Sequence, residues 1–584
     1  MSVLTKTDPA PAQRPPSGPR RSGRLLTAIR RPSFLVTLVV AVVVGWLAIG
    51  PIVALVWETL WRDGSFTLEG VEDAYSAYGF GGLVKDSFVF AIGTTIYAVL
   101  QGGVLAYLAA RTNLPFKGLI FASALVPLIT PGVLSTIAWI YLGSPRVGLI
   151  NHWLEPLFGP GALDIFSMPG MIFVEGQHLA PLVFLLLYAS FKSMDPSLEE
   201  SALMCGAKRR TVIRRITIPM AAPAIYASVV VMMVRGLEAF EVPALIGLPN
   251  GITVFTGRIW RALSDYPLDK ATAGSYSIGL LLLTALGMWW YGRLTRRNQK
   301  SYQTVTGKGF RSSTMDLGRA RWPIGALVIL YFVVAVVLPL FVLAYGSTQS
   351  FYSPPTWDTL TNPSLANYRD VFGDDTILRS LRNSILLAVL TATAVMLVMA
   401  IASWVVIRTK VRGRVLIDLL ATAPLAVPGI VLGFSLLTIY LWVPLPIYGT
   451  IWVLFIAYFT RFMPYGMRYA STSMVQVAGE LEESARMSGA TWWQVFRKVI
   501  LPLIMPGLIA GWIYVVTVSL RELSSSLLLY SPGNEVLSIT IWELWSNGRF
   551  PAVAAVGMVM IAVLLVIILA ARKLSSRFGI EDNI

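Results

Sequence analysis

Twelve long apolar runs, separated from one another by charge, proline or glycine, dominate this 584-residue chain. A bilayer-spanning helix needs roughly 20 mostly apolar residues, and the runs are about that long. Only 13% of the residues are charged and 55% are hydrophobic, whereas soluble domains carry about 25% charged residues. We therefore expect an all-α polytopic membrane protein with about 12 transmembrane helices, near 34–61, 87–110, 118–142, 169–191, 219–247, 273–292, 323–346, 383–407, 416–442, 449–470, 502–530 and 552–571.

Basic residues gather after the even-numbered runs, as the positive-inside rule expects of cytoplasmic loops. Residues 1–33 are rich in Pro, Ser and Arg and have too few apolar side chains to bury a core, so we expect a disordered cytoplasmic tail. Residues 293–322 are expected to form a basic cytoplasmic linker between a first permeation unit, 34–292, and a second, 323–572. A short tail, 573–584, follows, and the even number of spans places both termini in the cytoplasm.

The residue types that several other functions require are scarce. One cysteine excludes an intrachain disulfide framework, and two histidines argue against a Cys/His zinc site, so we expect no stable metal site. The net charge of +16 would indicate nucleic-acid binding in a soluble protein, but its placement in loops beside apolar runs argues against that partner. Gly307-Lys308-Gly309 lacks the other residues of a phosphate-binding loop. We identify no nucleotide site and no catalytic constellation, and therefore expect neither enzymatic activity nor a bound cofactor.

The chain contains an internal repeat. LEESALMCGA at 198–207 matches LEESARMSGA at 481–490, and Pro219 matches Pro502, each at a separation of 283 residues. Upstream, Pro131-Gly132 matches Pro428-Gly429 at a separation of 297 residues. The difference locates an insertion in the loop after the third run, at 143–168. The repeat predicts two tandem, pseudo-symmetric six-helix units in parallel orientation, with a pathway between them.

The repeated loop has the make-up of a short helix, a glycine and a second helical segment that ends at a proline. In helical spacing Ala202 and Gly206, like Ala485 and Gly489, lie four apart on one face and present almost no side chain, so another helix can approach closely. The glycine also permits a tight turn. A single copy would be explained as an interfacial helix that packs on its own bundle. Two ungapped copies favour docking surfaces for two copies of a partner, or for two faces of a dimeric one.

The segments LEESALMCGAKRRTVIRRITIPMAAPA and LEESARMSGATWWQVFRKVILPLIMPG resemble the EAA motif of binding-protein-dependent ABC import permeases. The resemblance implies one coupling helix per unit that fits a groove in a separate ATPase dimer, which hydrolyses ATP. It also implies an extracytoplasmic substrate-binding protein and a place in the bacterial inner membrane, in contact with lipid. Ile218 and Cys205 depart from the usual motif. The coupling residues that it implies are Glu199, Glu200, Ala202, Gly206, Ala207, Glu482, Glu483, Ala485, Gly489 and Ala490.

The fusion of two units, together with SLRELSSSLLLYSPG at 519–533, is most similar to the ferric-iron transport permeases and implies ferric iron as cargo. Fused permeases for thiamine, and related ones for aminoethylphosphonate or polyamines, share this architecture, so those cargoes remain alternatives. An ion-gradient-driven secondary transporter is the alternative from another class. It would also have twelve spans with intramembrane carboxylates, but it leaves the duplicated loop unexplained.

Ionisable groups inside apolar runs are costly in a bilayer and indicate functional sites. Such groups occupy the fifth and eleventh runs, where Glu238 and Arg521 are again 283 residues apart. Carboxylate and hydroxyl oxygens suit transient contact with a hard cation such as ferric iron, whereas charges at i,i+3 spacing could instead pair structurally; both interpretations stay open. The candidate pathway residues are Arg235, Glu238, Glu241, Arg521, Glu522, Ser524, Ser525 and Ser526.

The proline-glycine pairs 131–132 and 428–429 stand inside the third and ninth runs. Proline removes a backbone donor and glycine relaxes the backbone, so each pair is expected to kink its helix. The kink would serve either as a hinge beside a cavity or only as a packing adjustment.

Overall fold

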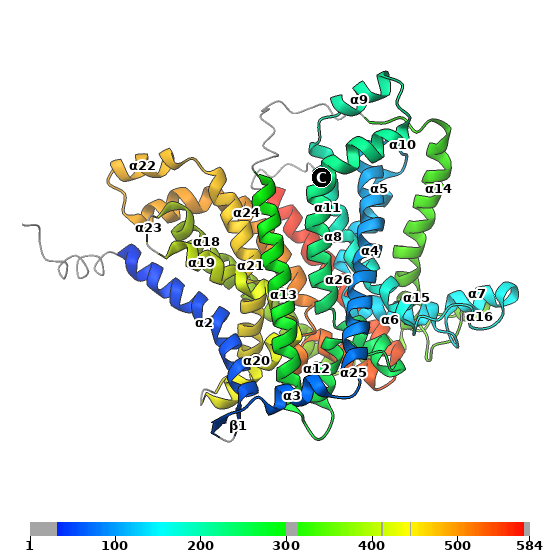
Figure 1. The fold of residues 1–584 in the computed structure, drawn as a ribbon. Coiled ribbons are helices and arrows are strands. Elements are labelled where there is room, and N and C mark those ends of the chain that lie inside the picture. Colours follow the sequence, from blue (N-terminus) through cyan, green and yellow to red (C-terminus); the bar gives the residue numbers. More distant parts are fainter. Residues whose placement is uncertain are drawn as a thin grey trace, which may run out of the picture.

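The computed structural model of the protein describes residues 32–62, 64–299, 314–409, 411, 413–443 and 446–576. Residues 1–31, 300–313 and 577–584, which include most of the expected tails and the middle of the expected linker, lie outside the described residues. The described chain is helical almost throughout, apart from a two-stranded antiparallel hairpin of β1 (Trp61–Arg62) and β2 (Ser65–Phe66) (Figure 1). It is therefore an all-α membrane protein, as the apolar runs predict.

The first unit runs from α2 to α13. Its helices are α2 (Pro32–Leu60), α3 (Glu69–Ser76), α4 (Phe80–Arg111), α5 (Lys117–Ile129), α6 (Gly132–Gly143), α7 (Leu149–Phe158), α8 (Met168–Ser193), α9 (Ser197–Met204), α10 (Arg209–Val212), α11 (Ile218–Glu238), α12 (Phe255–Ser264) and α13 (Lys270–Gln299). A π-helical turn, Ile213–Thr217, joins α10 to α11, and a second, Pro243–Gly247, with a 3₁₀ turn, Leu248–Asn250, lies between α11 and α12.

The second unit repeats this order. Its helices are α14 (Arg321–Phe332), α15 (Leu338–Ser347), α16 (Trp357–Thr361), α17 (Ala366–Gly373), α18 (Asp375–Arg408), α19 (Arg414–Thr422), α20 (Gly429–Trp442), α21 (Ile451–Gln476), α22 (Gly479–Met487), α23 (Trp492–Val495), α24 (Leu501–Leu520), α25 (Leu537–Ser546) and α26 (Phe550–Ser576). Shorter turns lie at Gly318–Ala320, Val333–Val337, Ala423–Ala426, Phe496–Ile500 and Ser526–Leu528.

Within the described ranges, nine helical segments are long and apolar enough to cross a membrane, and two bent pairs raise the number to eleven. The one expected span missing from this number is the tenth, α21, which has 26 residues and carries Arg461 and Arg468, whose charges lower its hydropathy. The fifth and eleventh spans were expected to reach residues 247 and 530, and this is wrong. Here α11 ends at Glu238 and α24 at Leu520, and the apolar chain continues as irregular turns inside the protein.

The third and ninth spans bend sharply at their proline-glycine pairs. The angle between α5 and α6 is 111°, and that between α19 and α20 is 109°. Pro131 and Pro428 take extended backbone angles, with ψ of 140° and 145°, so neither helix continues through its proline. The expected kinks are present in both units, at equivalent positions.

The repeat is also visible in how loops are fixed. Ser87 in α4 accepts a hydrogen bond from the backbone N–H of Phe255 at 3.0 Å, and Ser384 in α18 accepts one from Leu537 at 2.7 Å. These bonds satisfy a free amide at the start of α12 and of α25, where a helix has no internal acceptor. The two serines are 297 residues apart, the separation that the sequence shows for this part of the repeat.

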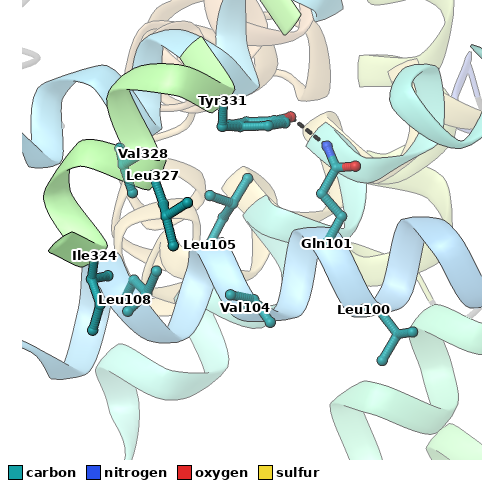
Figure 2. A pocket seen from close by; sticks show the side chains of 9 residues that line it. All are labelled: Leu100, Gln101, Val104, Leu105, Leu108, Ile324, Leu327, Val328 and Tyr331. Carbon is teal, nitrogen blue, oxygen red and sulfur yellow. Dashed lines mark hydrogen bonds between the residues drawn. The ribbon is translucent and has the colours of Figure 1, made fainter. Parts of the chain in front are cut away.

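The first long helix of each unit packs on the other unit. α2 lies against α19 and α20, whereas α14 and α15 lie against α5 and α6. Gln101 of α4 donates a hydrogen bond to the Tyr331 hydroxyl of α14, beside an apolar cavity of about 560 Å³ between the two helices (Figure 2). The two units are therefore tandem in sequence but interlocked in space.

Candidate coupling loops and translocation pathway

The two EAA-like loops lie at the same end of the bundle, opposite to β1 and α3 (Figure 1). In each loop a short helix, α9 or α22, is followed by a glycine, a second short helix and a π-helical turn that leads into the next span. The helix–glycine–helix order agrees with the sequence pattern. The expected flat face of Ala202 and Gly206 does not form within one helix, because α9 ends at Met204 and α22 at Met487.

The spacing that the two loops share is that of a Schellman cap, in which glycine lies just beyond the helix end. Gly206 N–H donates to the Leu203 carbonyl at 2.9 Å, and Ala207 N–H donates to the Ala202 carbonyl at 3.0 Å. In the second loop the same two bonds join Gly489 to Arg486 and Ala490 to Ala485. Both glycines have a left-handed backbone, with φ of 82° and 83°, which side chains with a Cβ rarely adopt. The glycine therefore ends the helix and turns the chain.

The paired glutamates of each loop point in opposite directions. Glu199 and Glu482 are buried, whereas Glu200 and Glu483 are exposed. Met204 and Met487, at the ends of the helices, are each 89% exposed. An exposed methionine and glutamate at the same place in both loops offer a partner the same apolar and acidic contacts twice.

Glu199 and Glu482 have different partners. Arg111 Nη2 donates to Glu199 Oε2 at 2.6 Å, and Thr217 Oγ1 donates to Glu199 Oε1 at 2.7 Å. Glu482 instead pairs with Arg486 of its own helix, at 2.5 Å. Arg408, the equivalent of Arg111, donates to the carbonyl oxygens of Met474, at 2.9 Å, and of Val477. α9 is thus tied to α4 through its own Glu199, whereas Arg408 of α18 holds the chain just before α22 and does not contact Glu482 in that way.

The candidate pathway residues gather where α11 and α24 end. Arg235 Nη1 lies 3.4 Å from Glu238 Oε2, and Arg235 also donates to the Tyr465 hydroxyl of α21, in the other unit. Glu238 interacts electrostatically with Arg461 and Glu522 of the second unit as well. The ion pairing that the i,i+3 spacing allowed is present, and the charges lie at the interface between the units.

The second unit contributes a buried pair. Arg461 Nε donates to Glu522 Oε2 at 2.8 Å, with side chains 17% and 8% exposed. Ser525 donates to Glu522 Oε1 from both its amide and its hydroxyl, at 3.0 Å each, and Ser526 hydrogen-bonds to Tyr458 at 2.8 Å. The oxygens of Ser525 and Ser526 are therefore already engaged within the unit. Ser524 is buried against Gly429, and Arg521 reaches across to the Leu128 carbonyl of the first unit.

The first unit places His178, Glu175 and Glu241 around the start of α6. His178 Nδ1 lies 3.9 Å from Glu175 Oε2, and both His178 and Glu241 face Gly132. Arg461 and Ser524, each 283 residues further on, face Gly429 in the same way. The proline-glycine breaks of both units thus open onto the charged residues.

We refer to Glu175, His178, Arg235, Glu238, Glu241, Arg461, Arg521 and Glu522 as the pathway cluster. Three of its members, Glu175, His178 and Arg461, were not predicted as pathway residues. The signal was available, since all three are ionisable groups in the fourth and tenth apolar runs. Tyr465 carries no such signal, because a tyrosine in a span is ordinary and only the fold brings it to Arg235.

The pathway cluster holds four carboxylates against three guanidinium groups. Glu238 Oε1, His178 Nε2 and Arg521 Nε are buried and have no hydrogen-bond partner among the described residues. Buried polar atoms are usually paired, so these three atoms have capacity left for a further polar partner. No three His, Cys, Asp or Glu side chains of the described chain come together in a group that could hold a metal ion.

Residues 102–300 and 397–579 both match the family of binding-protein-dependent transport system inner membrane components. The chain belongs to this family. Each match begins within the second span of a unit, in α4 or in α18, and covers the rest of that unit. The protein is therefore a fused permease with two units of an ABC importer, and it is a multi-pass membrane protein. The exchanged helices α2, α14 and α15 lie outside both matches.

Several relatives are similar over most of the chain. A ferric transport system permease protein, FbpB, of Actinobacillus pleuropneumoniae is 26% identical over 84% of this chain and 69% of its own. An ABC transporter permease protein, y4fN, of Sinorhizobium fredii is 24% identical over 89% of this chain and 88% of its own. A Salmonella paratyphi A permease named for 2-aminoethylphosphonate transport is 28% identical over 27% of this chain and 59% of its own.

Among solved structures, a bacterial ABC transporter involved in the import of the acidic polysaccharide alginate matches 44% of this chain and 96% of its own. The sequence identity is 17% and the TM-score is 0.36.

Proposed function

We propose that this permease carries ferric iron across the bacterial inner membrane, driven by ATP hydrolysis on a separate ATPase dimer. The observation that supports the cargo is the similarity to ferric transport permeases over more than four fifths of the chain. The pathway cluster supports it only in part. Its carboxylates suit a hard cation, yet most of them are paired with arginine or histidine, so iron would be bound weakly and released.

The energy is proposed to enter through α9 and α22. Closure of an ATPase dimer would move both helices, and the exposed Glu200, Met204, Glu483 and Met487 would contact its two grooves. A substrate-binding protein would deliver the cargo at the opposite end, beside β1 and α3. In this arrangement both chain termini lie in the cytoplasm, and the chain itself binds neither ATP nor another cofactor.

Aminoethylphosphonate is the second candidate cargo. A relative named for its transport matches part of the chain, and the three arginines of the pathway cluster suit an anionic phosphonate. An arginine-lined pathway also disfavours an unchelated trivalent cation, because like charges repel across a short distance in a poorly solvated interior. These three arginines are the observation that favours a phosphonate as the cargo.

Uptake of labelled cargo by cells with and without this chain tests the proposal. We expect loss of ferric-iron uptake alone when the chain is absent, with labelled thiamine and aminoethylphosphonate measured in parallel. Loss of phosphonate or thiamine uptake with unchanged iron uptake would show that the permease carries that compound and not ferric iron. Uptake that continues after the ATPase gene is deleted would instead indicate a secondary transporter driven by an ion gradient.

A further inference from the structure

The end of the linker between the units pairs with the loop that follows α4. Met315 and Thr112 form a parallel β-bridge. Met315 N–H donates to the Arg111 carbonyl at 2.8 Å, and Asn113 N–H donates to the Met315 carbonyl at 3.2 Å. We call the paired segments Arg111–Asn113 and Met315–Leu317 the linker junction. A segment that leads into the second unit is therefore joined, backbone to backbone, to the first.

Side chains strengthen the linker junction. Asn113 Oδ1 accepts from Leu317 N–H at 2.9 Å, and Asn113 Nδ2 donates to Asp316 Oδ1 at 2.5 Å. Asp316 also accepts from Gly318 N–H at 3.0 Å, and these hydrogen bonds hold the pKa of its carboxyl below the usual range. Asn113 thus uses both ends of its side chain on the linker.

The same short loop holds the first coupling helix. The backbone carbonyl of Arg111 accepts a hydrogen bond from Met315 N–H, and the Arg111 side chain donates one to Glu199 of α9. The Arg111 and Glu199 side chains are only 2% and 10% exposed. Because a buried ion pair is costly to break once one partner is removed, this connection is stiff. The linker junction, α4 and α9 are therefore one connected body.

Among the described residues, the second unit has neither a linker bridge nor a buried arginine–glutamate pair at the equivalent place. The Thr112–Met315 pair is the one isolated β-bridge recorded in that part of the chain. Arg408 of α18 instead donates to the carbonyl oxygens of Met474 and Val477, just before α22 begins. Glu482 pairs within α22, with Arg486, whose side chain is 52% exposed. The Glu482 side chain is 10% exposed, like that of Glu199, but its partner is half exposed and lies in the same helix, so the pair does not join α22 to another helix.

We propose that Arg111 and Asn113 are positioning residues through which the linker holds the first coupling helix, so that α9 is held more rigidly than α22. The inference rests on the proposed role of these helices as ATPase contacts. A stiff α9 would transmit movement of the ATPase directly to α4. It would transmit the movement also to α14, which is attached to α4 by the linker junction and by the Gln101–Tyr331 bond (Figure 2).

Hydrogen exchange of the full chain in lipid nanodiscs tests the difference in rigidity. The amides of α9 should exchange about tenfold more slowly than those of α22, since local opening depends on the contacts that must break. Glu199→Gln and Asn113→Ala should raise exchange in α9 toward that of α22 and leave α22 unchanged. Glu482→Gln is the matched control, and it should leave α9 unchanged.

A charge-swapped pair separates the specific contact from general destabilisation. Asn113→Asp places two carboxylates side by side and should loosen α9, whereas Asn113→Asp combined with Asp316→Asn restores a donor opposite an acceptor. We expect ferric-iron uptake, at matched membrane abundance, to fall severalfold in the single variant and to recover in the double variant. Uptake that stays low after exchange in α9 has been restored would contradict the positioning role.

The two proposals fail in different ways. Equal exchange of α9 and α22 in the unaltered chain, or acceleration of both helices by Asn113→Ala, would contradict the inference about rigidity while leaving the ATPase-driven function intact. Uptake by the unaltered chain without ATP would contradict the proposed function, whereas the exchange comparison would still hold.

Discussion

Gly206 and Gly489 show how a short motif is explained by backbone geometry at the scale of single residues. Each occupies the left-handed position that completes a Schellman cap, and an ideal Cβ at either site would meet no atom within 4 Å. Steric crowding within this chain is therefore not the reason for glycine. The reason is the backbone angle, which costs a residue with a Cβ about 1–2 kcal/mol.

Replacing Gly206 or Gly489 by alanine should therefore weaken the end of its helix by about 1–2 kcal/mol and reduce uptake, with normal membrane insertion. The measurement is labelled uptake at equal abundance in isolated membranes. Gly118→Ala in α5 is a matched control, since its Cβ also meets open space but its backbone is not left-handed. A comparable loss of uptake in Gly118→Ala would show that the backbone angle is not the cause.

The Arg461–Glu522 pair allows a structural role to be separated from a role in cargo transfer. Glu522→Gln leaves the buried Arg461 without its carboxylate and should cost about 3 kcal/mol. Adding Arg461→Gln removes the unpaired charge and should restore most of the stability. We expect thermal unfolding to recover in the double variant while uptake stays low. Recovery of both would show that the pair is only structural.

At the scale of elements, the bends between α5 and α6 and between α19 and α20 bring helix ends to the charged interface. The two breaks have the same sequence and nearly the same angle, but different surroundings. A Cβ at Gly429 would lie 2.7 Å from Arg461 Nη1 and 2.8 Å from Ser524 Cβ, whereas the nearest atom to a Cβ at Gly132 is 3.6 Å away. The second unit is therefore packed more tightly at its break.

Gly429→Ala should destabilise the protein by about 1–3 kcal/mol, because the start of α20 must move away from Ser524. Gly132→Ala should change stability by less than about 0.5 kcal/mol, since 3.6 Å is an ordinary contact. Thermal unfolding of both variants in the same lipid checks the difference. Equal midpoints for the two variants would contradict the packing difference between the breaks.

At the scale of the whole molecule, the exchange of first helices makes each unit incomplete without the other. Without the second unit α5 and α6 would lose α14 and α15, and without the first α19 and α20 would lose α2. The linker does not have to supply this association, because the packing itself joins the units.

A chain divided between Gly307 and Lys308 should therefore reassemble when both pieces are expressed together. A tag on one piece should recover the other from detergent extracts, and uptake should be retained. Each piece alone should be degraded or aggregate, because it exposes surfaces that the partner unit normally covers. Stable, monodisperse accumulation of either piece alone would contradict the interlocked arrangement.

An apolar run in the sequence predicts where the chain is buried in the membrane or in the protein, but not where a helix ends. The runs located the spans and the proline-glycine pairs located the bends, because both are local properties. The ends of the fifth and eleventh spans were wrong, because the chain after Glu238 and Leu520 stays apolar while it leaves the helix. Composition does not distinguish an apolar helix from an apolar turn buried in protein.

For the candidate pathway, the sequence predicted a charged region in the fifth and eleventh spans, but not its membership. Arg461 and His178 are also ionisable groups in apolar runs, but they were not among the predicted pathway residues. The approach of Arg461 to Glu238 could not have been predicted, because the two residues are separated by more than two hundred positions. Helical periodicity gives the face on which a residue lies, not the helix that it meets.

The sequence by itself determined that the chain is a membrane protein, that it is duplicated and that it carries two EAA-like loops. These are local patterns, set by hydropathy, spacing and backbone preference. Only the tertiary structure decided that α2 and α14 exchange units, that the two bent spans and the ends of α11 and α24 meet at one charged interface, and that α9 and α22 are held differently. Those features depend on contacts between distant segments, where geometry selects one partner from many with the same local pattern.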